Sequence, residues 1–135
     1  MRTRSWVRLA ERREPGFTLI ELVVVLAIIA ILVAAAVPLY LSARMKAYKA
    51  EAATVLQELK TLEWGYYQQY SAFTNALASL GFQPPASQNW AYTSPTVGGG
   101  AVTMSAVGST GSPVANQSMT VMLSSDGSVS TAATF

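Results

Sequence analysis

The apolar positions divide the chain into two stretches with different patterns. Residues 22–43 form a run of 22 positions without a charged side chain. A helix rises about 1.5 Å per residue, so this run is roughly 33 Å long and can cross the hydrocarbon core of a bilayer. The pattern predicts a membrane-spanning helix near the N-terminus. Glu21 stands at its start and Pro38 lies inside it.

Beyond residue 43 the apolar residues recur with the spacing of one helical face. This stripe consists of Tyr48, Ala52, Val55, Leu59, Leu62, Tyr66 and Phe73. The charged residues mostly occupy other faces: Arg44, Lys46, Lys49, Glu51, Glu58, Lys60 and Glu63. A helix with one apolar face must cover it with another element. The chain is therefore predicted to form one continuous helix from about Thr18 to Tyr70.

The segment after this helix has strong stop signals. Thr74 or Asn75 is expected to cap a short helix, which Gly81 ends. Pro84 and Pro85 then prevent any continuation of that helix. These residues are predicted to form a connecting segment.

The remaining residues have the pattern of short strands. Alternation and β-branched content indicate strands at residues 89–93, 101–107, 118–124 and 128–131. Residues 125–127, Ser-Asp-Gly, signal a hairpin between the last two, and residues 98–100 and 108–113 are expected as loops. The predicted fold class is α+β, with a long N-terminal helix packed on a small antiparallel sheet.

Charge is concentrated at the N-terminus. The whole chain has a formal net charge of +2, but residues 1–16 hold five arginines against two glutamates. The positive-inside rule places this end in the cytoplasm and the residues after the apolar run on the other side of the membrane. From residue 65 onward, Asp126 is the only acid or base apart from tyrosines.

This composition argues against an enzyme. The chain has no histidine and no cysteine, and one aspartate cannot form a carboxylate dyad or an acidic calcium site. No catalytic residue, metal ligand or cofactor is therefore expected. Direct DNA binding by the C-terminal part is not expected either, because binding to phosphates depends on Lys and Arg.

Residues 14–22 read EPGFTLIEL, and this run carries a family resemblance. It resembles the processing site of type IV prepilins and the related pseudopilins. That site has a basic leader ending in glycine, an aromatic first mature residue and a glutamate at the fifth mature position. Here these residues are Gly16, Phe17 and Glu21. The resemblance implies that a prepilin peptidase cuts between Gly16 and Phe17 and that the new amine of Phe17 is methylated.

The resemblance also implies a role for the isolated acid. A carboxylate next to hydrocarbon is costly without a partner, and cleavage would leave a cationic amine on Phe17 within one helical turn of Glu21. In the family, Glu21 of an incoming subunit would pair with Phe17 of its neighbour and set the register of assembly. Pro38 falls where many pilins have a helix proline, which implies a kink or local unwinding.

The expected organisation has four parts. Residues 1–16 are a cleaved leader, and residues 17–43 are a transmembrane helix that becomes the filament core. Residues 44–73 are the amphipathic continuation of the helix, and residues 74–135 are the connecting segment and sheet head.

The implied function is that of a structural subunit of a type IV pilus. Such a subunit is an inner-membrane precursor that the pilus assembly machinery builds into a helical homopolymer. The resulting fimbrium on the cell surface would serve twitching motility, adhesion or DNA uptake in competence. A pseudopilin of type II secretion and a minor pilin are alternatives. A signal peptide ending at residues 34–36 and an uncleaved anchor are further interpretations of the apolar run.

Overall fold

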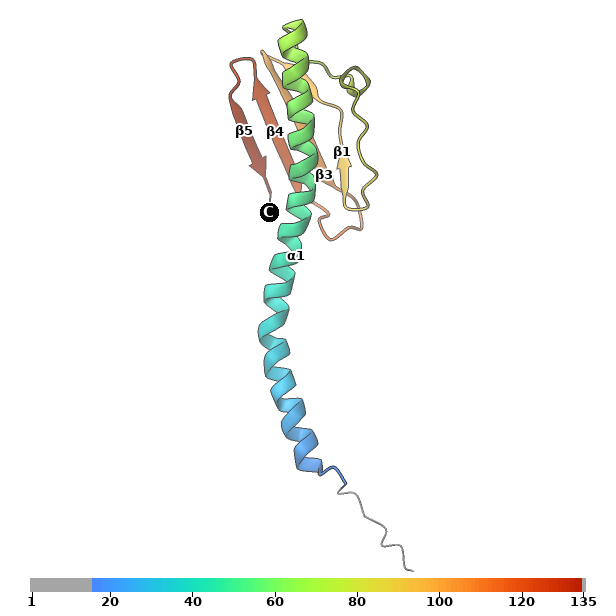
Figure 1. Cartoon of the computed structure of the whole chain (residues 1–135), viewed down its shortest axis with the longest axis vertical. Coiled ribbons are helices and arrows are strands. Elements are labelled where there is room, and N and C mark those ends of the chain that lie inside the picture. The colour runs from blue at the N-terminus through green and yellow to red at the C-terminus, as the bar shows by residue number, and fades with distance from the viewer. Residues whose placement is uncertain (1–15, 135) are drawn as a thin grey trace, which may run out of the picture. The chain divides into compact units, whose positions relative to one another are not determined.

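The computed structural model describes residues 16–134. They form a long helix, α1 (Leu19–Tyr70), a short 3-10 helix, η1 (Leu77–Leu80), and the strands β1 (Trp90–Tyr92), β2 (Thr96–Gly98), β3 (Ala101–Gly108), β4 (Ser118–Ser124) and β5 (Val129–Ala133). The strands make one antiparallel sheet, so the predicted α+β fold is confirmed (Figure 1). The chain divides into two compact units at residues 39 and 40.

The first unit consists of the N-terminal part of α1 and the residues before it. Its large apolar side chains are exposed, among them Leu19 at 80%, Ile31 at 71% and Leu39 at 73%. Helix α1 is long and apolar enough to cross a membrane by length and composition. The predicted apolar run is therefore helical throughout, and Pro38 lies inside the helix.

The second unit packs the rest of α1 on the sheet. The strands run in the order β1-β3-β4-β5, and β2 also pairs with β3. Alternate side chains of the two central strands face the helix and are buried: Val102, Met104, Ala106, Met119, Val121 and Leu123. Ala52, Leu56 and Leu59 of α1 meet them in one hydrophobic core. The predicted contact between helix and sheet is thus confirmed.

The buried stripe of α1 overlaps the predicted one, whose Tyr48, Val55 and Leu62 pack against the core, but its fully buried residues differ in part. It consists of Ala52, Leu56, Leu59 and Glu63, whereas Val55 is only half-buried. The interpretation of Glu63 as a residue of a polar face is wrong, because its side chain is 0% exposed. Glu63 follows Leu59 by one helical turn and so lies on the same face.

Helix α1 ends at Tyr70 as predicted, and the chain then turns back. Ser71 adopts a positive φ of 54°, which breaks the helix, and its N–H donates to the Tyr67 carbonyl at 2.7 Å. Phe73 lies beyond the helix, although the pattern assigned residues 44–73 to it. Its ring stacks on Tyr67 with centroids 4.6 Å apart. Phe73 therefore contacts the helix from the following segment.

The connecting segment contains η1, whose predicted cap is not the observed one. Ala76 occupies the N-cap position and makes no side-chain cap bond. Thr74, two residues before it, accepts the Ala76 N–H with its side-chain hydroxyl at 3.1 Å. Gly81 ends η1 with a φ of 63°, as predicted. A left-handed residue after a helix favours glycine, which has no Cβ to clash.

The strand predictions agree with the structure within two residues at each end, with one omission. Strand β2 was not predicted, and Gly98, expected in a loop, is its last residue. The strand has only three residues, all of them exposed, so neither length nor alternation indicated it. Gly99 and Gly100 turn the chain from β2 into β3 with φ values of 60° and 74°.

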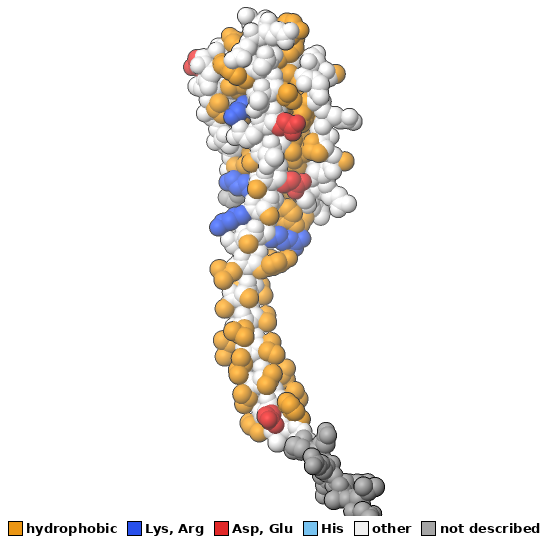
Figure 2. Space-filling model, viewed as in Figure 1, with side chains coloured by type: hydrophobic (Ala, Val, Ile, Leu, Met, Phe, Trp, Pro, Cys, Tyr) orange, Lys and Arg blue, Asp and Glu red, His pale blue; other side chains and the backbone are white. Residues whose placement is uncertain are grey.

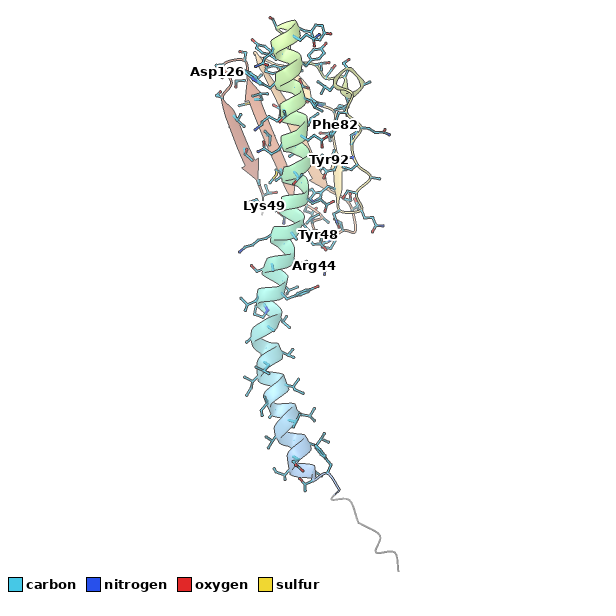
Figure 3. The ribbon with its side chains drawn as sticks, viewed as in Figure 1. Arg44, Tyr48, Lys49, Phe82, Tyr92 and Asp126 are labelled. Atoms are coloured by element: carbon cyan, nitrogen blue, oxygen red, sulfur yellow. The ribbon has the colours of Figure 1, made fainter. Side chains whose placement is uncertain are left out.

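The predicted hairpin between β4 and β5 is present. Asp126 Oδ1 accepts the Ser128 N–H at 2.8 Å, and Gly127 has a φ of 82°. The hydrogen bonds from Ser128 lower the pKa of the Asp126 carboxyl. Figure 3 shows Asp126 at the tip of this hairpin. An Asp whose side chain accepts a backbone N–H two residues later, followed by a Gly with positive φ, is a local turn signal. The sequence could therefore predict this hairpin.

A polar cluster ties α1 to the segment before β1. The Glu51 carboxylate accepts hydrogen bonds from the Ser87 hydroxyl and, at 3.1 Å, from the Asn89 amide. Next to it, Trp90 Nε1 donates to the Tyr48 carbonyl at 3.0 Å. Burial, with a smaller contribution from Glu51, raises the pKa of Tyr92 to about 12. This cluster holds the β1 edge of the sheet on the helix.

Glu63 has an unusual environment for a carboxylate. Its Oε2 accepts the Thr74 N–H at 3.3 Å, whereas Oε1 has no hydrogen-bond partner among residues 16–134. Burial raises the pKa of Glu63 above its ordinary value of 4.5, although the Thr74 bond opposes this shift. Since the ionised form is poorly solvated here, deprotonation destabilises the folded state.

We therefore expect Glu63→Gln to change how stability depends on pH. Because the pKa is raised on folding, the wild-type head loses stability as the pH rises from about 4.5 through the folded pKa. The Gln variant cannot ionise, so its melting temperature should exceed that of wild type at pH 7, with the difference shrinking toward about pH 4. Thermal melts of the full chain in detergent by circular dichroism measure this. A constant difference across the pH range would contradict the prediction.

Candidate assembly site

The N-terminus of α1 is closed by a reciprocal pair of side-chain bonds. Thr18 precedes the first helical residue, and its Oγ1 accepts the Glu21 N–H at 3.3 Å. In return, Glu21 Oε2 accepts the Thr18 N–H at 3.2 Å and the Thr18 hydroxyl at 2.9 Å. This is a capping box, in which two otherwise unpaired helix donors are satisfied. The negative charge also lies in the first turn, where the helix dipole favours it.

The sequence reasoning missed this capping box, although it has a sequence signature. Thr18-Leu-Ile-Glu21 matches the pattern of Ser or Thr followed three residues later by Glu or Gln. The structure therefore gives Glu21 a partner within its own chain. All of these bonds use Oε2. No bond from residues 16–134 reaches Oε1, and no Lys or Arg of that range contributes to the electrostatics of the carboxylate.

Gly16 and Phe17 lie in extended chain directly before the helix. Phe17 is 77% exposed, and a Cβ built on Gly16 would meet no atom within 4 Å. Packing in the described structure thus does not demand glycine at residue 16. The rest of the predicted leader, residues 1–15, lies outside the described residues.

An apolar surface follows this cap and extends on all sides of the helix. Figure 2 shows hydrophobic side chains along the N-terminal part of α1, with an acidic side chain at its start. Apart from Glu21, residues 19–43 contain no charged side chain, and all of them are exposed in the isolated chain. Such a surface is stable only when a bilayer or other apolar helices cover it.

Pro38 interrupts the hydrogen-bond ladder within this surface without ending the assigned helix. It has no N–H, so the Ala34 carbonyl one turn earlier lacks its usual partner. Residues 34–36 are all alanine, which permits close approach of a second helix. The boundary between the two compact units falls one residue later. A kink or unwinding at Pro38 stays a prediction.

The described residues offer little for other chemistry. Within residues 16–134, no group of three or more His, Cys, Asp and Glu side chains could hold a metal ion. One hollow of about 380 Å³ is bordered by uncharged residues only: Thr61, Leu62, Gly65, Tyr66, Gln69, Tyr70, Ser79 and Leu80. The helix start is therefore the best-defined candidate site.

The fold and this site together define an α+β architecture of the pilin type. Residues 12–37 match the family model for the prokaryotic N-terminal methylation motif. The chain is similar to the type IV major pilin protein PilA of Myxococcus xanthus (strain DK1622), with 34% identity over 80 residues. That match covers 59% of this chain and 36% of the length of that protein. No solved structure matches the chain significantly.

The two matches confirm the resemblance drawn from residues 14–22. The chain carries the prokaryotic N-terminal methylation motif, and over 80 residues it is similar to a type IV major pilin. Gly16, Phe17, Glu21 and Pro38 fall in or directly beside the matched region.

Proposed function

We propose that this chain is a structural subunit of a type IV pilus. The observation that carries the proposal is the order of parts at the N-terminus. The methylation motif includes the start of a capped helix whose apolar surface has no partner among residues 16–134. A membrane covers that surface before assembly, and the equivalent helices of neighbouring subunits cover it in the filament. The small head remains outside the helical core.

The four parts of the chain take successive roles in this proposal. Residues 1–16 are removed by prepilin peptidase, and residues 17–43 span the inner membrane and then form the filament core. Residues 44–73 join the core to residues 74–135, which form the surface. The partners are the peptidase, the inner-membrane assembly machinery and further copies of the chain. The filament serves motility, adhesion or DNA uptake, without direct DNA binding by the nearly uncharged head.

The capping box is compatible with pairing between subunits. Thr18 occupies Oε2 of Glu21, so Oε1 is free to accept a hydrogen bond from the methylated amine of Phe17 in a neighbouring subunit. Charge-assisted bonds of this kind are strong in a medium without water. The pairing would neutralise both charges as the helix leaves the bilayer. Each new subunit would then stop at the position where its Glu21 meets a neighbouring amine.

The processing step gives the most direct test. We expect mass spectrometry of filaments sheared from native cells to find a chain that begins with N-methylated Phe17 as the dominant protein. A processed chain that stays in the membrane fraction would instead support a pseudopilin or minor pilin. A chain that begins after residue 36, or that retains residues 1–16, would contradict the proposal.

A further inference from the structure

Strand β5 lies at one edge of the sheet that residues 16–134 form. It pairs with β4 on one side only, and all five of its residues are exposed (Figure 1). The pairing register is continuous from Leu123 with Val129 to Met119 with Ala133. No bulge therefore twists this edge away from solvent.

Hydrogen bonds at the two ends of β5 show which backbone groups face outward. Ser124 N–H donates to the Ser128 carbonyl at 3.0 Å, and Thr134 N–H donates to the Ser118 carbonyl at 3.0 Å. Residues of an antiparallel strand face its partner alternately. Ser130 and Ala132 therefore also bond to β4. The N–H and C=O groups of Val129, Thr131 and Ala133 point away from the sheet.

This edge lacks the features that usually protect a free strand. Natural edges are blocked by Lys, Pro, bulges or short length, but β5 reads Val-Ser-Thr-Ala-Ala. The opposite edge has two of these devices. It is divided into β1 and β2, of three residues each, and Pro95 lies buried between them. Only the β5 side therefore presents a continuous row of backbone donors and acceptors among the described strands.

We propose that β5 pairs antiparallel with β5 of a second copy of this chain and joins neighbouring pili side by side. The proposal rests on the proposed pilus function and names a further contact of the same subunit. Pairing centred on Thr131 places Val129 of each copy opposite Ala133 of the other. All the outward backbone groups then bond at once. An isologous contact of this kind closes between two filaments without disturbing the helical contacts inside either of them.

The occupant is a second copy because the edge is complementary to itself in shape and charge. Asp126 is the only acid or base from residue 65 onward, tyrosines apart, and Lys60 of α1 borders a hollow with Val129 near one end of β5. Pairing centred on Thr131 keeps the Lys60 side chains of the two copies at opposite ends of the contact, so like charges do not cluster. The outward residues are small or β-branched, which suits close strand pairing. A single pair is weak, but many pairs along two filaments of opposite polarity add up through multivalency.

Thr131→Pro tests the pairing through one backbone donor. The Thr131 N–H faces outward, so its loss leaves the β4–β5 ladder intact, and proline is tolerated on an outer strand. Thr131→Val keeps the N–H and is the matched control. We expect the Pro variant to form filaments of normal length but to leave about tenfold less protein in bundles, measured by low-speed pelleting and electron microscopy. If the Pro variant lowers the melting temperature, Thr131→Lys replaces it as the test. We expect this variant also to form filaments of normal length and to reduce bundling.

Cross-linking provides a second test, because the chain has no native cysteine. Thr131→Cys should give a dimer with a short bis-maleimide reagent several times faster than Thr110→Cys, which lies in an exposed turn of the same head. Equal cross-linking rates, or normal bundles from both Thr131→Pro and Thr131→Lys, would overturn the pairing. If wild-type cells make no filaments, the pilus proposal fails separately, and cross-linking of the full chain in detergent still decides whether β5 edges meet.

Discussion

Replacement of Glu21 by Ala should leave leader cleavage largely intact but reduce the yield of sheared filaments at least tenfold. The carboxylate is the only acid in residues 17–43, and in the proposed filament it neutralises the Phe17 amine of a neighbour. Without it, a buried ammonium would remain unpaired, which costs several kcal/mol. Quantitative immunoblots of sheared and membrane fractions measure the yield. The position of the mature N-terminus reports cleavage.

Two further variants separate the charge of Glu21 from its capping role. Glu21→Gln keeps the capping box, since Gln serves at this position as well as Glu, but it cannot neutralise an amine. Thr18→Ala loses the cap, at about 1 kcal/mol, but keeps the charge. We expect Glu21→Gln to fail in assembly and Thr18→Ala to form filaments. Glu58→Ala, on an exposed part of α1, should assemble normally. The opposite result for the first two variants would assign Glu21 a capping role only.

Replacement of Gly108 by Ala should prevent stable folding of the head. A Cβ at this position would lie 1.8 Å from the Val114 carbonyl oxygen and 2.6 Å from its carbon. Both atoms belong to a backbone that is held in place, because Val114 is fully buried and Gly108 N–H donates to the Gln117 carbonyl at 2.9 Å. The loop after β3 would have to move out of the core. The expected loss is about 3 kcal/mol or more.

Thermal unfolding of the full chain in detergent, together with its abundance in membranes, measures this effect. Gly98→Ala is the matched control, since a Cβ there would meet nothing within 4 Å. We expect that variant to melt close to the wild-type temperature. Equal melting temperatures for the two variants would show that the loop after β3 adapts, contrary to the rigid packing described above.

Most residues of the candidate site could be predicted from the sequence because they form a short local motif. Gly16, Phe17 and Glu21 stand within a few positions of one another, and the capping box could also have been found from Thr18 and Glu21 alone. The Ser125-Asp126-Gly127 turn was predicted for the same reason. Each of these features is determined by bonds or preferences between residues that are near neighbours in the chain.

The features that were missed depend on contacts between distant segments. Strand β2 exists because it pairs with β3, since its three exposed residues carry no pattern of their own. Gly108 was predicted to be a loop residue, but it is the last residue of β3 and its Cα lies close to the Val114 carbonyl. The residues next to Gly108 in the sequence do not indicate this close contact with the Val114 backbone.

The sequence by itself determined the apolar run, the motif at its start, the length of α1 and the α+β class, because these follow from periodicity and local chemistry. The tertiary structure alone decided which helix face is buried, and thus that Glu63 rather than Val55 enters the core stripe. It also decided which strand is left at the edge of the sheet. The physical reason is that burial and strand order depend on the register between elements, and that register is set by packing across the whole head.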